Sequence, residues 1–173
     1  MKSNIILIGF MGSGKSSVGK SLSHLIEKTL IDMDEVIQKT EGMSILEIFQ
    51  QHGELYFRAK ERELVNKLDS QSNLIIATGG GIVLDQRNMD MLSTNGIVVY
   101  LKCDFQTILQ RIKLNHSRPL FNTKNLHEFK QIYNSRILVY KENANIVVDV
   151  NEISIDQTAA EIMDRVKKKG YKT

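Results

Sequence analysis

The sequence predicts an α/β fold, a three-layer sandwich in which helices cover both faces of a mainly parallel sheet. Short apolar runs alternate along the chain with longer stretches of helical periodicity, which is the pattern of strand-helix-strand units. Several of the runs are apolar at consecutive positions, as strands buried on both faces are. The runs cover residues 5–9, 29–34, 74–78, 97–103 and 145–150.

The length and composition fit one globular domain spanning residues 1–173. The hydrophobic fraction of 42% and the charged fraction of 25% are ordinary for such a domain. The net charge of +3 is too small to favour nucleic acid as a partner, although it suits small anionic substrates. The lysines at 167–169 are therefore interpreted as a solvated helix end, and a nucleic-acid patch is the less favoured alternative.

The cellular setting is predicted from features that the sequence lacks. A single cysteine, Cys103, allows no internal disulfide, which fits a reducing compartment. The apolar stretch near the start is short and leads into Ser13–Lys15, which does not resemble a signal cleavage site. No run reaches the ~18 apolar residues that a membrane span needs. We therefore expect a cytoplasmic protein with no membrane partner, and a monomer, because no exposed apolar stripe suggests a dimer.

The first strand, at 5–9, leads into the segment Gly9–Ser16, whose sequence GFMGSGKS matches G-x-x-x-x-G-K-[ST]. A helical pattern over 17–27 follows, so the motif has the strand-turn-helix context that it requires. Glycines let the backbone wrap an anion, and the helix N-terminus adds a positive dipole end. Lys15 is placed to reach the β- and γ-phosphates, and the Ser16 hydroxyl to ligate Mg²⁺. The loop is predicted to bind the phosphates of a nucleoside triphosphate.

The second strand, at 29–34, ends in Asp32 and Asp34, at the edge where a parallel sheet forms its binding crevice. Residues two apart on a strand share a face, so both carboxylates can point the same way. In that arrangement Asp32 would hold Mg²⁺ through water, and Asp34 would accept a hydrogen bond from a hydroxyl that attacks phosphorus. An equally weighted alternative is a capped turn into a helix that starts near Asp34.

The amphipathic helix predicted at 54–68 carries two further features. Arg58 and Glu61 lie three residues apart and can pair; alone this would be a weak surface pair, whereas near a substrate Glu61 would hold the Arg58 fork in place. Asn66–Asp69 matches the N-K-x-D guanine-reading pattern of GTP-dependent switches, but it continues the helix, and the sequence has no D-x-x-G. It is interpreted as helix surface. The apolar face of the helix is expected to comprise Phe57, Leu64, Val65 and Leu68.

The third strand, at 74–78, is followed by Gly79–Gly81, again at a carboxyl end. Three glycines let a ligand approach backbone N–H groups closely, and a plain turn would need fewer. Later in the chain, the polar stretch 113–125 interrupts two helical patterns and is long for a connection, which favours a lid. Arg118 within it would swing onto the phosphates and neutralise transition-state charge as the lid closes. Arg136, on the next helix, is a second candidate anion anchor.

Taken in order, these motifs resemble those of shikimate kinase, over nearly the whole chain and at matching spacing. They are G-x-x-G-S-G-K-S at 9–16, D-x-D at 32–34, F-R-x-x-E at 57–61, G-G-G at 79–81, R-P-L at 118–120 and an arginine at 136. The resemblance implies the P-loop nucleoside-monophosphate-kinase-like fold, a parallel sheet of order 2-3-1-4-5, and a substrate-binding subdomain at about 33–61. It implies the reaction ATP + shikimate → ADP + 3-phosphoshikimate, a step toward chorismate and the aromatic amino acids.

The resemblance also assigns roles to individual residues. Asp34 would bind the shikimate hydroxyls and is the candidate base, while Arg58 and Arg136 would clamp the carboxylate. Lys15 and Arg118 would complete the catalytic set. On the ATP side, the phosphates would be bound by Gly12, Ser13, Gly14, Lys15, Ser16 and Ser17, adenine would pack on Arg111, and Arg118 would contact ATP from the lid. The metal would be supported by Ser16 and Asp32. On the acceptor side, substrate contacts would come from Gly79, Gly80, Gly81 and Glu61, and an apolar wall from Phe49 and Phe57.

The match to the family pattern is incomplete in places, and alternatives stay open. The loop ends in Ser16–Ser17, where Ser-Thr is commoner, and the likeness fades near Asn151, where the family closes around adenine. The strand at 74–78 lacks a terminal aspartate, a lack the family shares, so Asp32 gains weight as a metal ligand. The nearest alternative function is another small P-loop kinase, for gluconate or a nucleoside monophosphate. A GTP-dependent switch is the alternative from a different class.

Overall fold

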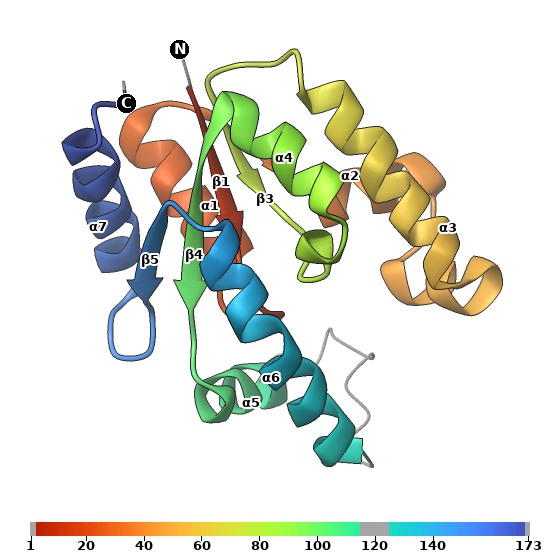
Figure 1. Ribbon diagram of the computed structural model, residues 1–173. Coiled ribbons are helices and arrows are strands. Elements are labelled where there is room, and N and C mark those ends of the chain that lie inside the picture. The colour runs from red at the N-terminus through yellow and green to blue at the C-terminus, as the bar shows by residue number, and fades with distance from the viewer. Residues whose placement is uncertain (1–2, 115–124, 172–173) are drawn as a thin grey trace.

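The computed structural model describes residues 3–114 and 125–171. Its strands form one parallel sheet in the order β2-β3-β1-β4-β5, which confirms the expected order 2-3-1-4-5. All strand arrows that can be followed in Figure 1 end at the same edge of the sheet, so the loops after them meet there. The strands are β1 (Asn4–Ile8), β2 (Thr29–Asp32), β3 (Leu74–Ala77), β4 (Gly96–Lys102) and β5 (Ile146–Asp149).

Helices cover both faces of this sheet, which confirms the layered α/β fold. Helices α1 and α7 pack against each other on one face, and α4 and α6 lie over the other, with α3 beyond them on α4 (Figure 1). The helices are α1 (Lys15–Ile26), α2 (Met33–Glu41), α3 (Ile45–Leu68), α4 (Gln86–Asn95), α5 (Phe105–Leu114), α6 (Leu126–Asn143) and α7 (Ile155–Lys168), with a short 3-10 turn, η1 (Ile82–Leu84), after β3. In the part of the chain that the structure describes, we find no helix that combines the length and the hydropathy of a membrane span.

The core explains why the strands could be recognised. Residues Ile5–Ile8 of β1 are at most 1% exposed, as expected for a central strand covered on both faces. Cys103 is buried as a small hydrophobic residue, as its sequence context suggested. Asn66 and Lys67 are exposed on α3, which agrees with their interpretation as helix surface. The expected apolar face of α3 is also buried, at Phe57, Leu64, Val65 and Leu68.

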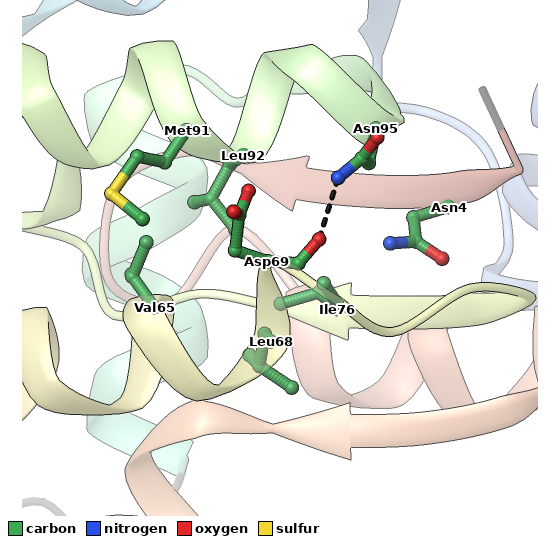
Figure 2. Close-up of a pocket in the computed structure, with 8 residues that line it drawn as sticks. All are labelled: Asn4, Val65, Leu68, Asp69, Ile76, Met91, Leu92 and Asn95. Atoms are coloured by element: carbon green, nitrogen blue, oxygen red, sulfur yellow. Dashed lines mark hydrogen bonds between the residues drawn. The ribbon is translucent and has the colours of Figure 1, made fainter. Parts of the chain in front are cut away.

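A small cavity lies at the edge of the sheet opposite the loops. It has a volume of about 10 Å³ and lies between the end of α3, the start of β1 and the end of α4, as Figure 2 shows. The Asn95 side chain donates a hydrogen bond of 2.6 Å to the Asp69 carbonyl across it. A space of this size holds about one water molecule. This cavity is therefore too small for a substrate.

Two differences between the predicted and the observed boundaries matter for the site. The second strand ends at Asp32 and not at residue 34, because Asp32 caps the helix that follows. Helix α3 starts at Ile45, nine residues before the predicted start at 54, and it is broken at Gly53 (φ 80°, ψ 173°). The early turns begin with a capping box, in which Ser44 and Glu47 bond each other's backbone N–H groups. The break at Gly53 interrupts the helical period, so the sequence pattern reveals only the second half.

Candidate active site

The loop between β1 and α1 has the backbone geometry of an anion-binding turn. Gly12 and Gly14 take positive φ angles of 79° and 99°, which a residue with a side chain adopts at a cost. Gly14 is the N-cap of α1 and supplies no side-chain cap, so the first N–H groups of the helix are left for a ligand. No acidic residue stands in the first turn of α1. The helix N-terminus therefore presents donors and a positive dipole end.

Lys15 lies within the loop and points back along it. Its side chain is buried, and Nζ donates hydrogen bonds to the carbonyl oxygens of Gly9 (2.8 Å) and Phe10 (3.1 Å). These carbonyls fix the ammonium group beside the backbone that surrounds the predicted phosphate site. The charge is thus already positioned at the loop, which is consistent with the predicted role of Lys15.

The two residues predicted to hold a metal meet directly. The Ser16 hydroxyl donates to Asp32 Oδ2 over 2.5 Å. The other carboxylate oxygen, Oδ1, accepts from the backbone N–H groups of Asp34 and Glu35 and so caps α2. The expectation that Asp32 and Asp34 share one face of a strand is therefore wrong. The capped turn is the correct alternative, with Asp32 as the N-cap and Asp34 in the first turn of α2.

Asp34 nevertheless reaches the glycine segment that follows β3. A β-carbon at Gly79 would lie 2.6 Å from Glu61 Oε1 and 3.0 Å from Asp34 Oδ1. The two carboxylates therefore converge on one point, although they come from different helices. A side chain at position 79 would force the ends of both acidic side chains to shift, so glycine lets them approach the segment closely. The three glycines therefore serve the packing of the protein's own groups as well as the close approach of a ligand.

Arg58 and Glu61 form a buried pair, so the view of them as a weak surface pair is wrong. Glu61 is 0% exposed, and its Oε2 accepts from Arg58 Nη1 over 2.5 Å. Arg58 Nε and Nη2 donate to Glu54 Oε1, so two acidic groups fix one guanidinium. Burial raises the pKa of the Glu61 carboxyl, and the charge of Arg58 opposes that rise. This arrangement fits the alternative in which Glu61 orients Arg58.

Gly80 and Gly81 connect this network to Arg136 and to the phosphate loop. A β-carbon at Gly81 would overlap the Arg58 guanidinium, and one at Gly80 would lie 3.2 Å from the Met11 nitrogen of the loop. The Gly80 carbonyl faces Arg136 Nη1 at 3.5 Å. Asp34, Arg58 and Arg136 thus all meet the Gly79–Gly81 segment, and that segment packs on the phosphate loop.

The chain is similar to known proteins in family pattern, sequence and structure. The family model described as shikimate kinase matches residues 11–167. The chain belongs to the shikimate kinase family. A shikimate kinase from Sulfurihydrogenibium sp. is 39% identical over 96% of this chain and 99% of the relative, and one from Dehalococcoides mccartyi is 40% identical over 96% and 95%. The solved shikimate kinase from Acinetobacter baumannii in complex with shikimate superposes with a TM-score of 0.91 at 32% identity, covering 99% of this chain and 97% of that one.

The aromatic residues expected to form an apolar wall lie together. The Phe49 and Phe57 rings are 5.0 Å apart between centroids, and the Arg58 guanidinium lies 5.3 Å from the Phe57 centroid. Phe49 comes from the part of α3 before the Gly53 break, so the break sets how the two rings meet. The contact of these rings with a substrate stays a prediction.

A cavity of about 490 Å³ adjoins the cluster between α3 and α4. Arg58, Glu61 and Gly81 line it on the side of the cluster, and Asp85 and Asn88 line it on the side of α4. Its volume lies in the range of small-molecule sites. Of the carboxylate-binding groups that the shikimate kinase resemblance implies, Arg58 therefore borders open space.

The predicted adenine side is only partly described. Arg111 Nη1 donates to the Ser13 carbonyl (3.2 Å) and Nη2 to the Val150 carbonyl (2.7 Å), so its guanidinium lies against the phosphate loop. Its packing on adenine stays a prediction. Arg118 lies outside the described residues, as does the lid predicted at 113–125 apart from its ends. The family likeness fades near Asn151. Its side-chain oxygen accepts a hydrogen bond from the Asp104 backbone N–H, and its side-chain nitrogen donates one to the Asp149 carboxylate.

Three residues of the cluster were missed at the level of sequence. Glu54 forms an ion pair with Arg58, and the Tyr140 hydroxyl donates to the Gly80 carbonyl. The Phe10 ring lies under the Arg136 guanidinium, with 5.8 Å between the ring centroid and the guanidinium carbon. Glu54 and Tyr140 stand four residues from Arg58 and Arg136 on the same helices, and that spacing is a signal that could have found them. No comparable signal marks Phe10, because its contact depends on how α6 crosses the loop.

Proposed function

We propose that this chain transfers the γ-phosphoryl group of ATP to the 3-hydroxyl of shikimate, giving 3-phosphoshikimate and ADP. One observation carries the proposal for the site. Asp34, Arg58 and Arg136 meet on the Gly79–Gly81 segment, and that segment packs against the phosphate loop at Met11. An acceptor held by these three side chains would lie beside a triphosphate held by the loop.

The acceptor site is matched to a hydroxy acid. Arg58 and Arg136 would bind the carboxylate, because a planar guanidinium fork suits a planar carboxylate. Glu61 and Glu54 hold Arg58 in one orientation, which lowers the entropy lost on binding. The Gly80 backbone would add a contact to the same carboxylate. A nucleobase acceptor would need a stacking and amide-rich pocket, which this charged cluster does not resemble.

Asp34 would accept hydrogen bonds from the ring hydroxyls and orient the attacking oxygen. Phosphoryl transfer passes through a loose transition state, so catalysis depends mainly on position and on charge neutralisation. We therefore propose that Asp34 positions the hydroxyl first and takes its proton late. Lys15 and the N-terminal N–H groups of α1 would neutralise charge on the transferred group. Arg118 is proposed to add a further positive charge from the lid.

The residues present fit a magnesium ion. Ser16 Oγ and Asp32 Oδ2 are adjacent hard oxygen ligands beside the phosphate loop. Among the described residues, no group of three or more histidine, cysteine or acidic side chains could hold a metal. This suits Mg²⁺, which keeps several waters and phosphate oxygens among its ligands. When bound, the ion would neutralise charge on the β- and γ-phosphates.

An acceptor screen tests the proposed reaction. Purified protein, ATP and Mg²⁺ are mixed separately with shikimate, gluconate and nucleoside monophosphates, and ADP release is followed by a coupled assay. We expect turnover that depends on shikimate and disappears when the divalent ion is chelated. Turnover only with another acceptor would overturn the substrate. Tight GTP binding without acceptor-dependent turnover would favour the switch alternative.

We also propose that the enzyme acts as a cytoplasmic monomer on small molecules alone. The mild net charge of +3 and the single buried cysteine support this proposal. Sedimentation velocity at several protein concentrations tests the oligomeric state. A sedimentation coefficient that rises with concentration toward the dimer value would contradict the monomer.

A further inference from the structure

The hydroxyl of Tyr140 forms one of the shortest contacts in the cluster. Tyr140 is 1% exposed on α6, and its hydroxyl donates to the Gly80 carbonyl over 2.5 Å. Its ring stacks on Tyr100 of β4, with centroids 5.1 Å apart and planes at 22°. The core therefore fixes the ring, and the ring fixes where the hydroxyl points. Burial raises the pKa of Tyr140 to about 12, so the hydroxyl keeps its proton at neutral pH.

Both arginines of the proposed carboxylate clamp lie near this hydroxyl. Arg136 precedes Tyr140 by four residues on α6, so the two side chains share one face of the helix. The charge and hydrogen bond of Arg136, and the charge of Arg58, oppose the rise in the Tyr140 pKa. Arg136 itself reaches the Gly80 carbonyl only at 3.5 Å. The shorter bond from Tyr140 is therefore the main hold on that carbonyl.

Holding this carbonyl fixes the peptide that follows it. In a planar trans peptide, the C=O of one residue and the N–H of the next point in opposite directions. The bond to the Gly80 oxygen thus sets the direction of the Gly81 N–H. Glycine on both sides of the peptide gives it little conformational preference of its own. A hold from outside the segment is needed, and Tyr140 supplies it from α6.

We propose that Tyr140 is a positioning residue for the substrate carboxylate. Its hydroxyl orients the Gly80–Gly81 peptide and keeps Arg136 beside it. This inference rests on the proposed function, in which Arg58 and Arg136 bind that carboxylate, and it adds the Gly81 N–H as a donor beside the Gly80 backbone. Tyr140 acts through these groups and does not itself contact the reacting atoms.

The test compares two buried tyrosines of α6 that each donate a hydroxyl hydrogen bond to a backbone carbonyl. Tyr133 also lies on α6, is buried, and donates its hydroxyl to a backbone carbonyl, that of Cys103, over 3.0 Å. In Y140F the KM for shikimate should rise about tenfold, the loss expected for one buried hydrogen bond, while kcat and the KM for ATP change little. In Y133F thermal stability should fall by about as much as it does in Y140F, because each variant loses one buried hydrogen bond. The KM for shikimate should stay at the wild-type value in Y133F.

Two further variants separate the inference from the proposed function. If R136A leaves the KM for shikimate unchanged, the proposed carboxylate site fails. If R136A raises that KM and Y140F does not, only the role of Tyr140 fails.

Incorporation of 3-fluorotyrosine at position 140 keeps the ring and the donor, so it should restore the wild-type KM, and it remains available if Y140F does not fold. A KM raised equally with 3-fluorotyrosine would overturn the role of the hydroxyl.

A substrate analogue provides the sharpest readout. With an analogue in which a hydroxymethyl group replaces the carboxylate, wild type and Y140F should differ by less than about twofold. A penalty in Y140F as large as that seen with shikimate would mean that Tyr140 acts on the fold in general, and it would overturn the inference.

Discussion

The phosphate loop and the acceptor site are assembled in opposite ways. The loop and the start of α1 are contiguous, from Gly9 to Ser17, and their geometry follows from glycine φ angles and one helix N-terminus. The acceptor site collects Asp34 from α2, Arg58 from α3, Gly79–Gly81 from the turn after β3, and Arg136 from α6. Local backbone preferences determine the loop, whereas the acceptor site exists only once the parallel sheet has brought four distant segments together.

The charges of the two regions are held differently as well. Lys15 is held by the carbonyl oxygens of Gly9 and Phe10, which carry no net charge. Arg58 is held by the carboxylates of Glu61 and Glu54, one of them fully buried. Removal of a partner from a buried pair leaves an uncompensated charge, which is costly. The acceptor site should therefore be the more easily disturbed by substitutions that do not touch substrate.

The largest expected effect comes from removing the charge of the loop. Lys15→Met keeps the length of the side chain but takes the cation from the phosphates. We expect kcat to fall on the order of 10³-fold, the scale of one preorganised charge at a transition state. Lys20→Ala, an exposed lysine on the same helix, is the control and should keep wild-type turnover. Steady-state kinetics measure both, and a Lys15→Met enzyme with more than about a tenth of wild-type kcat would contradict the role.

The next effect tests the acceptor side through Asp34. Asp34→Asn keeps the shape of the side chain but weakens it as an acceptor and removes it as a base. The value of kcat/KM for shikimate should fall about 10²-fold, within the range of general-base catalysis. Glu35→Gln, the exposed neighbouring acid, should change it little. If Asp34→Asn kept both turnover and shikimate affinity near wild type, the positioning role and the base role would both be wrong.

What the sequence could predict follows the same division. The loop motif, the strands and the sheet order were predictable, because a contiguous pattern determines each of them or the family shares it. The helical position of Asp34 was not, because the strand pattern and the Asp32 cap compete over the same two residues. The burial of Glu61 was indicated by spacing, since it lies four residues after Phe57 and three before Leu64 on the apolar face of α3. Spacing could not reveal which residues cover its carboxylate. That covering comes from Gly79, eighteen residues later in the chain.

A smaller effect should come from the glycine that packs on Arg58. A methyl group in Gly81→Ala would overlap the Arg58 guanidinium, which can move because it ends a flexible side chain. The backbone at Gly81 (φ −99°) tolerates alanine. We therefore expect the KM for shikimate to rise about tenfold. Thermal stability should fall as well, because a displaced Arg58 no longer compensates the buried charge of Glu61.

A double-mutant cycle decides whether this effect passes through the arginine. In an Arg58→Ala background, Gly81→Ala should add less than about twofold to the KM for shikimate, because the displaced group is already gone. Fully additive effects in the cycle would mean that Gly81 acts on the substrate independently of Arg58.

The smallest effect concerns Asp85, which connects the end of the glycine segment to α3. Its carboxylate caps α4 and accepts from Arg62 of α3 and from the exposed Arg87. Hydrogen bonds from Arg87 and Arg62 hold the pKa of Asp85 well below its usual value. Asp85→Asn keeps a capping oxygen but removes the charge, so the cost near pH 7 should be under about 1 kcal/mol.

The sign of the pH dependence identifies the cause of that cost. A carboxyl with a depressed folded-state pKa contributes stability above its unfolded pKa of about 4, and this contribution is lost as pH falls through the folded value. The difference in unfolding free energy between wild type and Asp85→Asn should therefore be largest near neutral pH and shrink progressively below about pH 4. Urea unfolding across that range measures it. A difference of constant size would assign the effect to the cap or to packing, because neither depends on the charge of Asp85.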